Sequence, residues 1–122
     1  MTKYSRQELY PEIGKEGQRK ICRAAVAIIG VGAIGTVAAE LLCRAGVKKL
    51  ILIDRDFVEE SNLQRQVLFE EQDVGKAKAL AAQDHLQKIN ADVEAEVHVV
   101  DLNFKNIGEV VKLLWPMSTA HI

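Results

Sequence analysis

The sequence has few of the residues that build disulfide frameworks or metal centres. It contains two cysteines, Cys22 and Cys43, and three histidines, His85, His98 and His121. Two isolated cysteines are too few for a disulfide framework or a metal site. No Glu or Cys accompanies the histidines at the spacing of metal ligands. We therefore expect no metal site built from these residues.

The sequence also lacks a large excess of one charge and any long hydrophobic run. Its formal net charge is −1, which gives no electrostatic reason to expect nucleic acid or an anionic membrane as a partner. No apolar run approaches the ~20 residues of a membrane span. The polar N-terminus, MTKYSRQELYPEIG, has no apolar signal-peptide core. We expect one cytoplasmic domain with no nucleic-acid or membrane partner.

What the chain does contain is a glycine-rich loop between an apolar strand and a helix. The run AAVAII at 24–29 predicts a buried strand, and GVGAIG follows it. Gly30 permits a tight turn, Gly32 lets the backbone approach a phosphate, and Gly35 lets the helix pack on the strand. The helix expected at 33–45 directs its N-terminal N–H groups at an anion. Its predicted apolar face comprises Ile34, Val37, Ala38, Leu41, Leu42 and Ala45.

A second apolar strand ends in an acidic residue. Leu50 to Ile53 leads directly to Asp54. Asp54 follows Gly35 by about 20 residues, the usual place for a carboxylate that binds ribose hydroxyls. The strand, loop, helix and acidic strand end together predict a nucleotide site.

A polar cassette follows, and it changes the expected ligand. It comprises Asn62-Leu63-Gln64-Arg65-Gln66 and then Gly75-Lys76-Ala77-Lys78. Taken singly, Arg65 and Lys78 are typical surface charges, and Asn62 is a typical helix cap. Together, Arg65 and Lys78 bring more positive charge than the two phosphates of a dinucleotide require. We expect both side chains to point towards Gly32, with Asp54 on the ribose side.

These motifs resemble a known family. Arg6-Gln7, GVGAIG, LIDRDFVEESNLQRQ and VGKAKA are similar to the adenylation domain of the ubiquitin-activating superfamily, and most similar to its MoeB/ThiF branch. The similarity extends from about Tyr4 to Asn103. It implies adenylation, with ATP and Mg2+, of the C-terminal glycine of a ubiquitin-like sulfur-carrier protein. The acyl-adenylate then passes to a sulfur donor or a thiol, and a homodimer is implied.

The resemblance also implies which residues bind the nucleotide. Asp54 would bind the ribose, and Gln66 would support the triphosphate contacts. The glycines that would border the nucleotide are Gly30, Gly32 and Gly35, and the triphosphate would be held by Asn62, Arg65 and Lys78.

The resemblance implies three catalytic residues, each with a positively charged side chain. Arg65 and Lys78 would offset charge that develops on the phosphates. Arg6 resembles an arginine that reaches the ATP of the partner subunit in the family's homodimers. No nucleophile or general base is required of the protein, because the attacking group is already a carboxylate.

The end of the chain departs from the family pattern. Family members continue into a fourth strand, an aspartate segment that binds magnesium, and later cysteine-rich elements. This sequence ends in LLWPMSTAHI, so we expect the magnesium ligand to lie beyond Ile122. The chain as given is expected to bind ATP weakly and to adenylate slowly or not at all, because that ligand is missing.

The predicted fold class is α/β, a Rossmann-like parallel sheet truncated before the fourth strand. Residues 1–22 are expected to form an N-terminal helical arm and residues 23–122 a partial nucleotide-binding domain. Strands are expected at 25–29, 49–54 and 93–100, and helices at 33–45, 76–89 and 106–114. The third strand alternates polar and apolar residues, which is typical of an edge. The expected strand order is therefore 3-2-1.

Some alternatives stay open. The chain could be a fragment of an NAD-dependent dehydrogenase, which would need a nicotinamide subsite beyond the fourth strand. It could also be a non-catalytic nucleotide-binding or dimerisation module. The arm has little of its own sheet to pack on, so we expect it to lie against another subunit or to be mobile.

Overall fold

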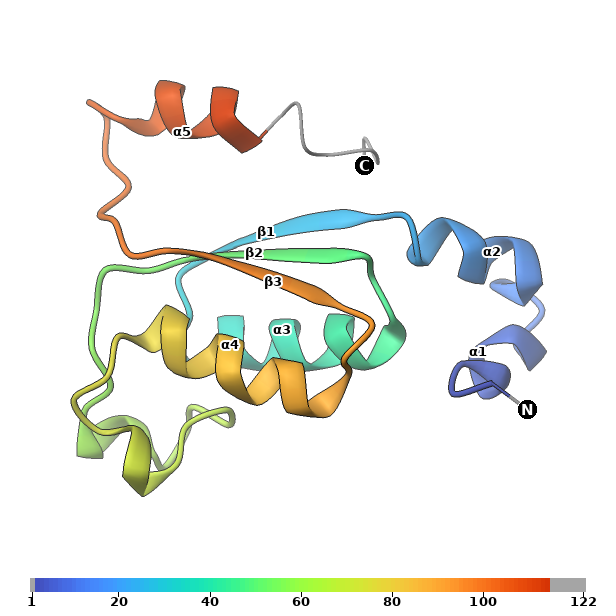
Figure 1. Ribbon diagram of the computed structural model, residues 1–122, viewed down its shortest axis with the longest axis horizontal. Helices are drawn as coiled ribbons and strands as arrows, with labels where there is room; N and C mark the ends of the chain where they lie inside the picture. The colour runs from blue at the N-terminus through green and yellow to red at the C-terminus, as the bar shows by residue number, and fades with distance from the viewer. Residues whose placement is uncertain (1, 115–122) are drawn as a thin grey trace.

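Three parallel strands form the centre of the computed structural model, which describes residues 2–114 (Figure 1). The strands are β1 (Ala25–Ile29), β2 (Lys49–Ile53) and β3 (Glu94–His98). Their order is β1-β2-β3, which confirms the predicted order and leaves β2 in the centre. The register pairs Ile29 with Ile53 and Ile53 with His98. All three strands therefore end at one edge of the sheet.

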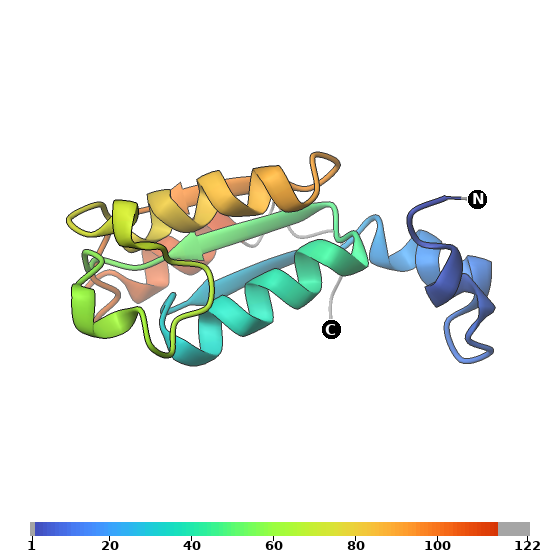
Figure 2. The ribbon, with the colours of Figure 1, turned by 90° about the horizontal axis from the view of Figure 1, so that it is seen from below.

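Helices α3 (Ala33–Ala45) and α4 (Lys78–Ile89) cover one face of the sheet (Figures 1 and 2). The core between them is built from strand residues such as Leu50 and Leu52, and from α4 residues such as Ala79, Ala82 and Leu86. Helix α4 begins two residues later than predicted. Ala77 has extended backbone angles and bridges Phe57, so the helix starts only after it.

The predicted apolar face of α3 is wrong at Ile34, Val37 and Leu41, which are exposed, whereas Leu42 packs against the core. Ile34 is 86% exposed and Leu41 is 62% exposed. The buried residues are Thr36, Ala39 and Cys43, which recur at the same helical period on another side. Small side chains allow the helix backbone to approach the sheet closely. The Thr36 hydroxyl tolerates burial because it donates to the Gly32 carbonyl oxygen at 2.6 Å.

The face of the sheet away from α3 and α4 carries charged side chains from β2 and β3. Lys49 and His98 both contact Glu96, at 3.3 Å and 3.0 Å. The hydrogen bond from His98, followed by Lys49, lowers the pKa of the Glu96 carboxyl despite its partial burial. These pairs account for the alternation that the sequence shows in the third strand. Helix α5 (Ile107–Leu114) lies on this side of the sheet (Figure 1).

The N-terminal arm comprises α1 (Ser5–Leu9) and α2 (Gly14–Ile21). The helices are separated between Leu9 and Gly14, and Gly14 has a φ of +57°. The arm is attached to its own domain, although through the ends of α3 and α4 and not through the sheet. The side-chain amides of Gln7 and Gln18 both donate to the backbone carbonyl oxygen of Ala45 at 3.0 Å.

A second set of contacts holds the start of the arm. Lys3 and Tyr4 reach the turn after α4, where Lys3 pairs with Asp92 at 3.0 Å and Asn90 donates to the Tyr4 hydroxyl at 2.9 Å. Lys3 lowers the pKa of the Asp92 carboxyl, and burial raises the pKa of Tyr4. The arm is therefore attached at the end of the domain where the strands begin. Between residues 2 and 114, no helix has the length and apolar character needed to cross a membrane.

Candidate functional site

The glycine loop has a geometry that only glycine permits at two positions. Gly30 has a φ of +89°, and its N–H donates to the Ile53 carbonyl oxygen at 2.8 Å. A Cβ on Gly35 would collide with the Gly30 carbonyl oxygen. The first turn of α3 therefore packs directly on the end of β1, as the sequence predicted.

The N-terminus of α3 is open. Gly32 is the N-cap residue and has no side chain to accept the first helical N–H groups. The first intrahelical bond runs from the Thr36 amide to the Gly32 carbonyl oxygen at 2.9 Å. The preceding amides have no intrahelical acceptor, and the dipole places partial positive charge there. This end of the helix is suited to an anion.

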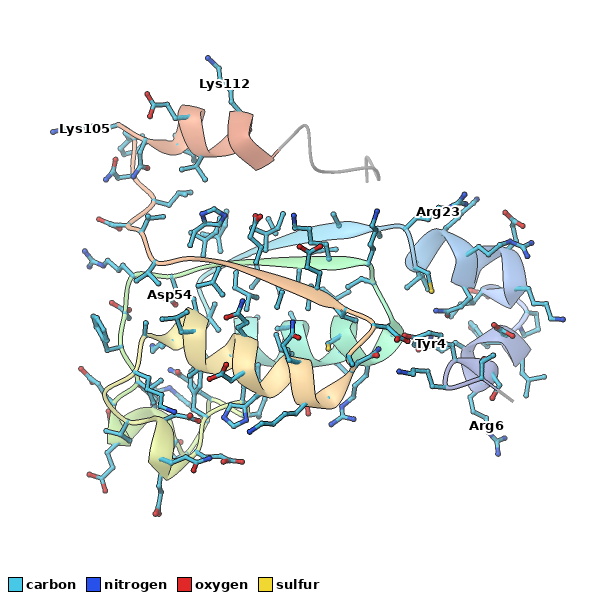
Figure 3. The ribbon with its side chains drawn as sticks, viewed as in Figure 1. Tyr4, Arg6, Arg23, Asp54, Lys105 and Lys112 are labelled. Carbon is cyan, nitrogen blue, oxygen red and sulfur yellow. The ribbon has the colours of Figure 1, made fainter. Side chains whose placement is uncertain are left out.

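Asp54 lies beside the loop, at the end of β2 (Figure 3). Its Oδ2 accepts the Val31 N–H at 2.7 Å, and its Oδ1 accepts the Asp56 N–H at 2.7 Å. Both carboxylate oxygens are thus engaged by backbone donors. The carboxylate is held rigidly, with lone pairs left for a ligand hydroxyl.

The polar cassette approaches the loop through Gln66, which Asn62 helps to hold. Asn62 ends a short 3-10 helix, η1 (Glu60–Asn62), and its side chain accepts the Glu59 N–H at 2.8 Å. The backbone N–H of Gln66 donates to the backbone carbonyl oxygen of Asn62 at 2.9 Å. Gln66 is only 3% exposed, and its side-chain nitrogen lies 3.8 Å from the point where a Cβ on Gly32 would be. Its Oε1 is buried with no hydrogen-bond partner among residues 2–114.

Lys78 is buried at the start of α4. The residue is 8% exposed, and its amide donates to the Asp56 carbonyl oxygen at 2.9 Å. It lines a polar cleft of about 420 Å³ together with Asn62, Phe57 and their neighbours. No acidic side chain within the described part of the chain forms an ion pair with it. The cleft thus contains a cation available to an anionic ligand.

The two arginines occupy different positions. Arg65 is exposed, and its guanidinium donates to the Ser61 carbonyl oxygen at 3.0 Å. It is therefore engaged with its own turn. Arg6 is exposed on the arm, at the opposite end of the molecule from Asp54 (Figure 3). Arg6 cannot act on the glycine loop of its own subunit from this position.

A second cleft, of about 230 Å³, lies at the ends of the strands. It is lined by residues that follow β1, β2 and β3, including Gly30, Asp54 and Asp101. Arg55 and Asp56 line both clefts, and Arg55 pairs with Asp101 at 3.4 Å. Sequence reasoning did not single out Arg55, Asp56 or Asp101. The sequence could have indicated them, because these residues follow predicted parallel strands, and the carboxyl ends of parallel strands meet at one edge of the sheet.

Three potential metal-binding groups also meet elsewhere, which the sequence spacing did not predict. In the described part of the chain, ligand atoms of Glu70, Asp73 and His85 lie within 4.8 Å of one another. Asp73 already accepts the Glu70 N–H at 2.8 Å, contacts His85 at 2.7 Å and pairs with Lys76 at 3.7 Å. Helix capping and a neighbouring cation account for this cluster. None of its members lines the clefts at Asp54 or Lys78.

A larger cavity of about 800 Å³ lies between the arm and the domain. Its lining includes Tyr4, Gln18 and Cys22. The Gln18 amide is already satisfied by the Ala45 carbonyl oxygen, and Tyr4 is bonded to Asn90. The polar groups with unused capacity converge instead at the glycine loop, so the candidate site is placed there.

The sequence matches one family along nearly its whole length. The profile of the ThiF family matches residues 4–116. A "Sulfur carrier protein ThiS adenylyltransferase" from Bacillus subtilis is 50% identical over 112 residues, which cover 90% of this chain and 33% of that protein. A "Sulfur carrier protein adenylyltransferase" from Thermus thermophilus is 40% identical over 92% of this chain and 41% of that protein.

Solved structures agree with the sequence matches. The crystal structure of Escherichia coli MccB with ATP has a TM-score of 0.83 and 35% sequence identity, and covers 90% of this chain and 35% of that protein. The chain thus spans about a third to two fifths of the length of these relatives. The likeness covers the strands, the glycine loop and the polar cassette described above.

Proposed function

Because the chain belongs to the ThiF family, we propose that it binds ATP at the glycine loop. We further propose that it contributes this site to adenylation of the C-terminal glycine of a ubiquitin-like sulfur-carrier protein. Similar proteins are named as sulfur-carrier adenylyltransferases, and one solved relative is described in complex with ATP. The chain's own share of that activity is a proposal, because it spans less than half of those proteins.

One observation carries the proposal. The open N-terminus of α3 lies beside Gln66, whose buried side-chain nitrogen approaches Gly32, and the nearby cassette contains a buried lysine, Lys78, with no acidic partner among residues 2–114. Burial of an unpaired cation is unfavourable unless a ligand or water compensates. A polyphosphate supplies the anion that α3 and Lys78 lack.

The residue roles follow this geometry. Asp54 would bind the ribose hydroxyls. The triphosphate would lie at the N-terminus of α3, and the side chains proposed to hold it are those of Asn62, Arg65, Gln66 and Lys78. To contact the triphosphate, the Arg65 guanidinium would have to break its hydrogen bond to the Ser61 carbonyl oxygen.

In the proposed reaction, an oxygen of the carrier's terminal carboxylate attacks the α-phosphorus of ATP. A carboxyl–phosphorus bond forms, the bond to the bridging oxygen breaks, and pyrophosphate leaves with the electron pair. Charge increases on the departing oxygens, where Lys78 and the α3 N–H groups are suited to stabilise it. No proton needs to be removed from the attacking carboxylate.

Magnesium is implied by the family resemblance, but the three aspartates at the carboxyl ends of the strands, Asp54, Asp56 and Asp101, are each already engaged by nitrogen donors. Magnesium prefers oxygen ligands that are free to coordinate. Both oxygens of Asp54 accept backbone N–H groups. Asp56 and Asp101 are each paired with Arg55. No step is therefore assigned to a metal held by these residues.

Two measurements test the function. We expect ATP to bind more tightly than NAD in parallel titrations, and ATP–pyrophosphate exchange to require a sulfur-carrier protein. Tighter binding of NAD would support the dehydrogenase alternative and would contradict the proposal. Slow or absent exchange is already expected of the chain as given, so only a complete lack of exchange with every sulfur-carrier protein tested would favour the second candidate, a non-catalytic nucleotide-binding module.

The assembly is a further part of the proposal. We propose a homodimer in which Arg6 acts on the site of the partner subunit. The distance between the arm and its own glycine loop supports this arrangement (Figure 3). A cytoplasmic location agrees with the absence of a membrane-spanning helix among residues 2–114 and is likewise a proposal.

A further inference from the structure

Two consecutive amides attach the glycine loop to the end of β2. Gly30 donates to the Ile53 carbonyl oxygen at 2.8 Å, and Val31 donates to Asp54 Oδ2 at 2.7 Å. The second bond has a charged acceptor, which makes it the stronger type. Val31 is 0% exposed. Water therefore has poor access to replace Asp54 as its partner.

The Asp54 carboxylate is itself fixed in orientation. Its second oxygen accepts the Asp56 N–H at 2.7 Å. The Asp56 carbonyl oxygen in turn accepts the Lys78 N–H at 2.9 Å. A continuous set of hydrogen bonds thus runs from the glycine loop through Asp54 to the start of α4. Both ends of this set carry groups proposed to bind phosphate.

We propose that Asp54 is a positioning residue for the phosphate loop, in addition to its proposed ribose contact. Its carboxylate holds the Val31 N–H, which keeps that amide directed away from the ligand and leaves the N–H groups of α3 to face it. This inference rests on the proposed nucleotide-binding function. Its consequence is that binding of phosphate depends on Asp54 even when the ligand has no ribose.

The sign of the effect separates this role from simple electrostatics. A carboxylate near a polyphosphate repels it, so removing the negative charge should by itself strengthen binding. Loss of the Val31 hydrogen bond should weaken binding, because the loop then samples conformations in which α3 does not face the ligand. A residue that only binds ribose would leave binding of a ribose-free ligand unweakened.

The experiment is a calorimetric titration of the folded chain with inorganic tripolyphosphate. We expect Asp54→Ala to weaken binding roughly tenfold or more. Asp54→Asn should weaken it less, because its side-chain carbonyl oxygen can still accept the Val31 N–H. Asp84→Asn is the matched control, since it removes an exposed carboxylate on α4 that lines neither cleft and does not touch Val31. For that control we expect binding that is equal or stronger.

Amide hydrogen exchange provides a second readout that does not depend on the ligand. The Val31 amide should exchange slowly in the unsubstituted chain and faster in Asp54→Asn. The exchange rate of the Asn90 backbone amide should not change. This amide donates to the Leu86 carbonyl oxygen at the far end of α4. An unprotected Val31 amide in the unsubstituted chain would overturn the inference, whether or not the variants fold.

The two hypotheses fail in different ways. If the unsubstituted chain binds neither ATP nor tripolyphosphate, the proposed function is wrong, and the exchange of Val31 still tests the hydrogen bond. If it binds both, and Asp54→Ala binds tripolyphosphate equally well or better, then the positioning role is wrong and the proposed function stands.

Discussion

At the scale of single residues, Lys78 combines burial with a charge that has no acidic partner. It lines the same cleft as Asn62. Lysine is rarely this buried without a partner, and the free energy lost on desolvation must be recovered elsewhere. A bound phosphate would recover it.

Lys78→Gln should therefore weaken ATP binding by roughly ten- to a hundredfold, the range of a charge-assisted contact. Lys76→Gln is the matched control, because Lys76 is two residues away, is exposed and pairs with Asp73. For Lys76→Gln we expect a change below about threefold, since an exposed pair contributes little. Equal losses for both variants would show that only general positive charge matters. Titration with ATP at fixed ionic strength measures both.

Gly35 offers a test of the loop itself. Gly35→Ala would place a Cβ against the Gly30 carbonyl oxygen, and neither backbone can yield without separating α3 from β1. We expect a loss of about 1–3 kcal/mol in the free energy of unfolding and weaker ATP binding. Gly108→Ala in α5 is the control, because nothing lies within 4 Å of its added Cβ. Chemical denaturation should show that the free energy of unfolding of Gly108→Ala is unchanged or slightly higher. A stable Gly35→Ala protein would contradict this packing.

At the scale of elements, the turn before α4 depends on one buried carboxylate. Asp73 ends a 3-10 helix, η2 (Glu71–Asp73), and accepts the Glu70 N–H. Burial raises the pKa of this carboxyl, but the Glu70 N–H, His85 and Lys76 outweigh burial, so the net pKa is below its ordinary value of 3.8. The ionised form is therefore the one that stabilises the fold.

Because the folded-state pKa of Asp73 is depressed, its contribution is complete above the unfolded-state value and is lost as the pH falls through the folded-state value. We expect Asp73→Asn to be less stable than the unsubstituted chain at neutral pH. The difference in the free energy of unfolding should shrink as the pH falls below 3.8. Urea unfolding across this range measures it. A difference that stays constant with pH would show that Asp73 acts only as an uncharged cap.

At the scale of the whole molecule, the arm and the candidate site lie at opposite ends, as the positions of Arg6 and Asp54 show (Figure 3). Lys3, Tyr4, Gln7 and Gln18 attach the arm to the domain near the start of the strands. The glycine loop lies at the other end, after β1. Any role for Arg6 in ATP binding therefore requires a second subunit.

Mixing two defective variants tests this arrangement. Arg6→Ala and Lys78→Gln should each bind ATP weakly as homodimers. A mixed dimer contains one site with an intact Lys78 and an Arg6 supplied by the other subunit, so tight binding should return at that site after the subunits exchange. Titration of the mixture and sedimentation of the unsubstituted chain provide the measurements. A strictly monomeric chain, or a mixture that binds no better than its parts, would rule out the role of Arg6 in the partner's site.

The sequence by itself determined the features that depend on local backbone geometry and periodicity. The tight turn at Gly30, the close approach at Gly35 and the parallel strand order were predicted and are confirmed. Glycine permits positive φ whatever surrounds it. Alternation of strands and helices restricts a short chain to few topologies.

The tertiary structure decided the features that depend on contacts between distant residues. The apolar pattern of α3 is broad, so only packing on the sheet selected the face with Thr36, Ala39 and Cys43. Docking of the arm depends on polar pairs such as Tyr4 with Asn90, and no periodicity marks them. The bond between Val31 and Asp54 likewise joins two strand ends that are adjacent only in the folded sheet. Sequence spacing identified the residue types of the site, whereas folding determined which of their atoms are already engaged and which are free to bind a ligand.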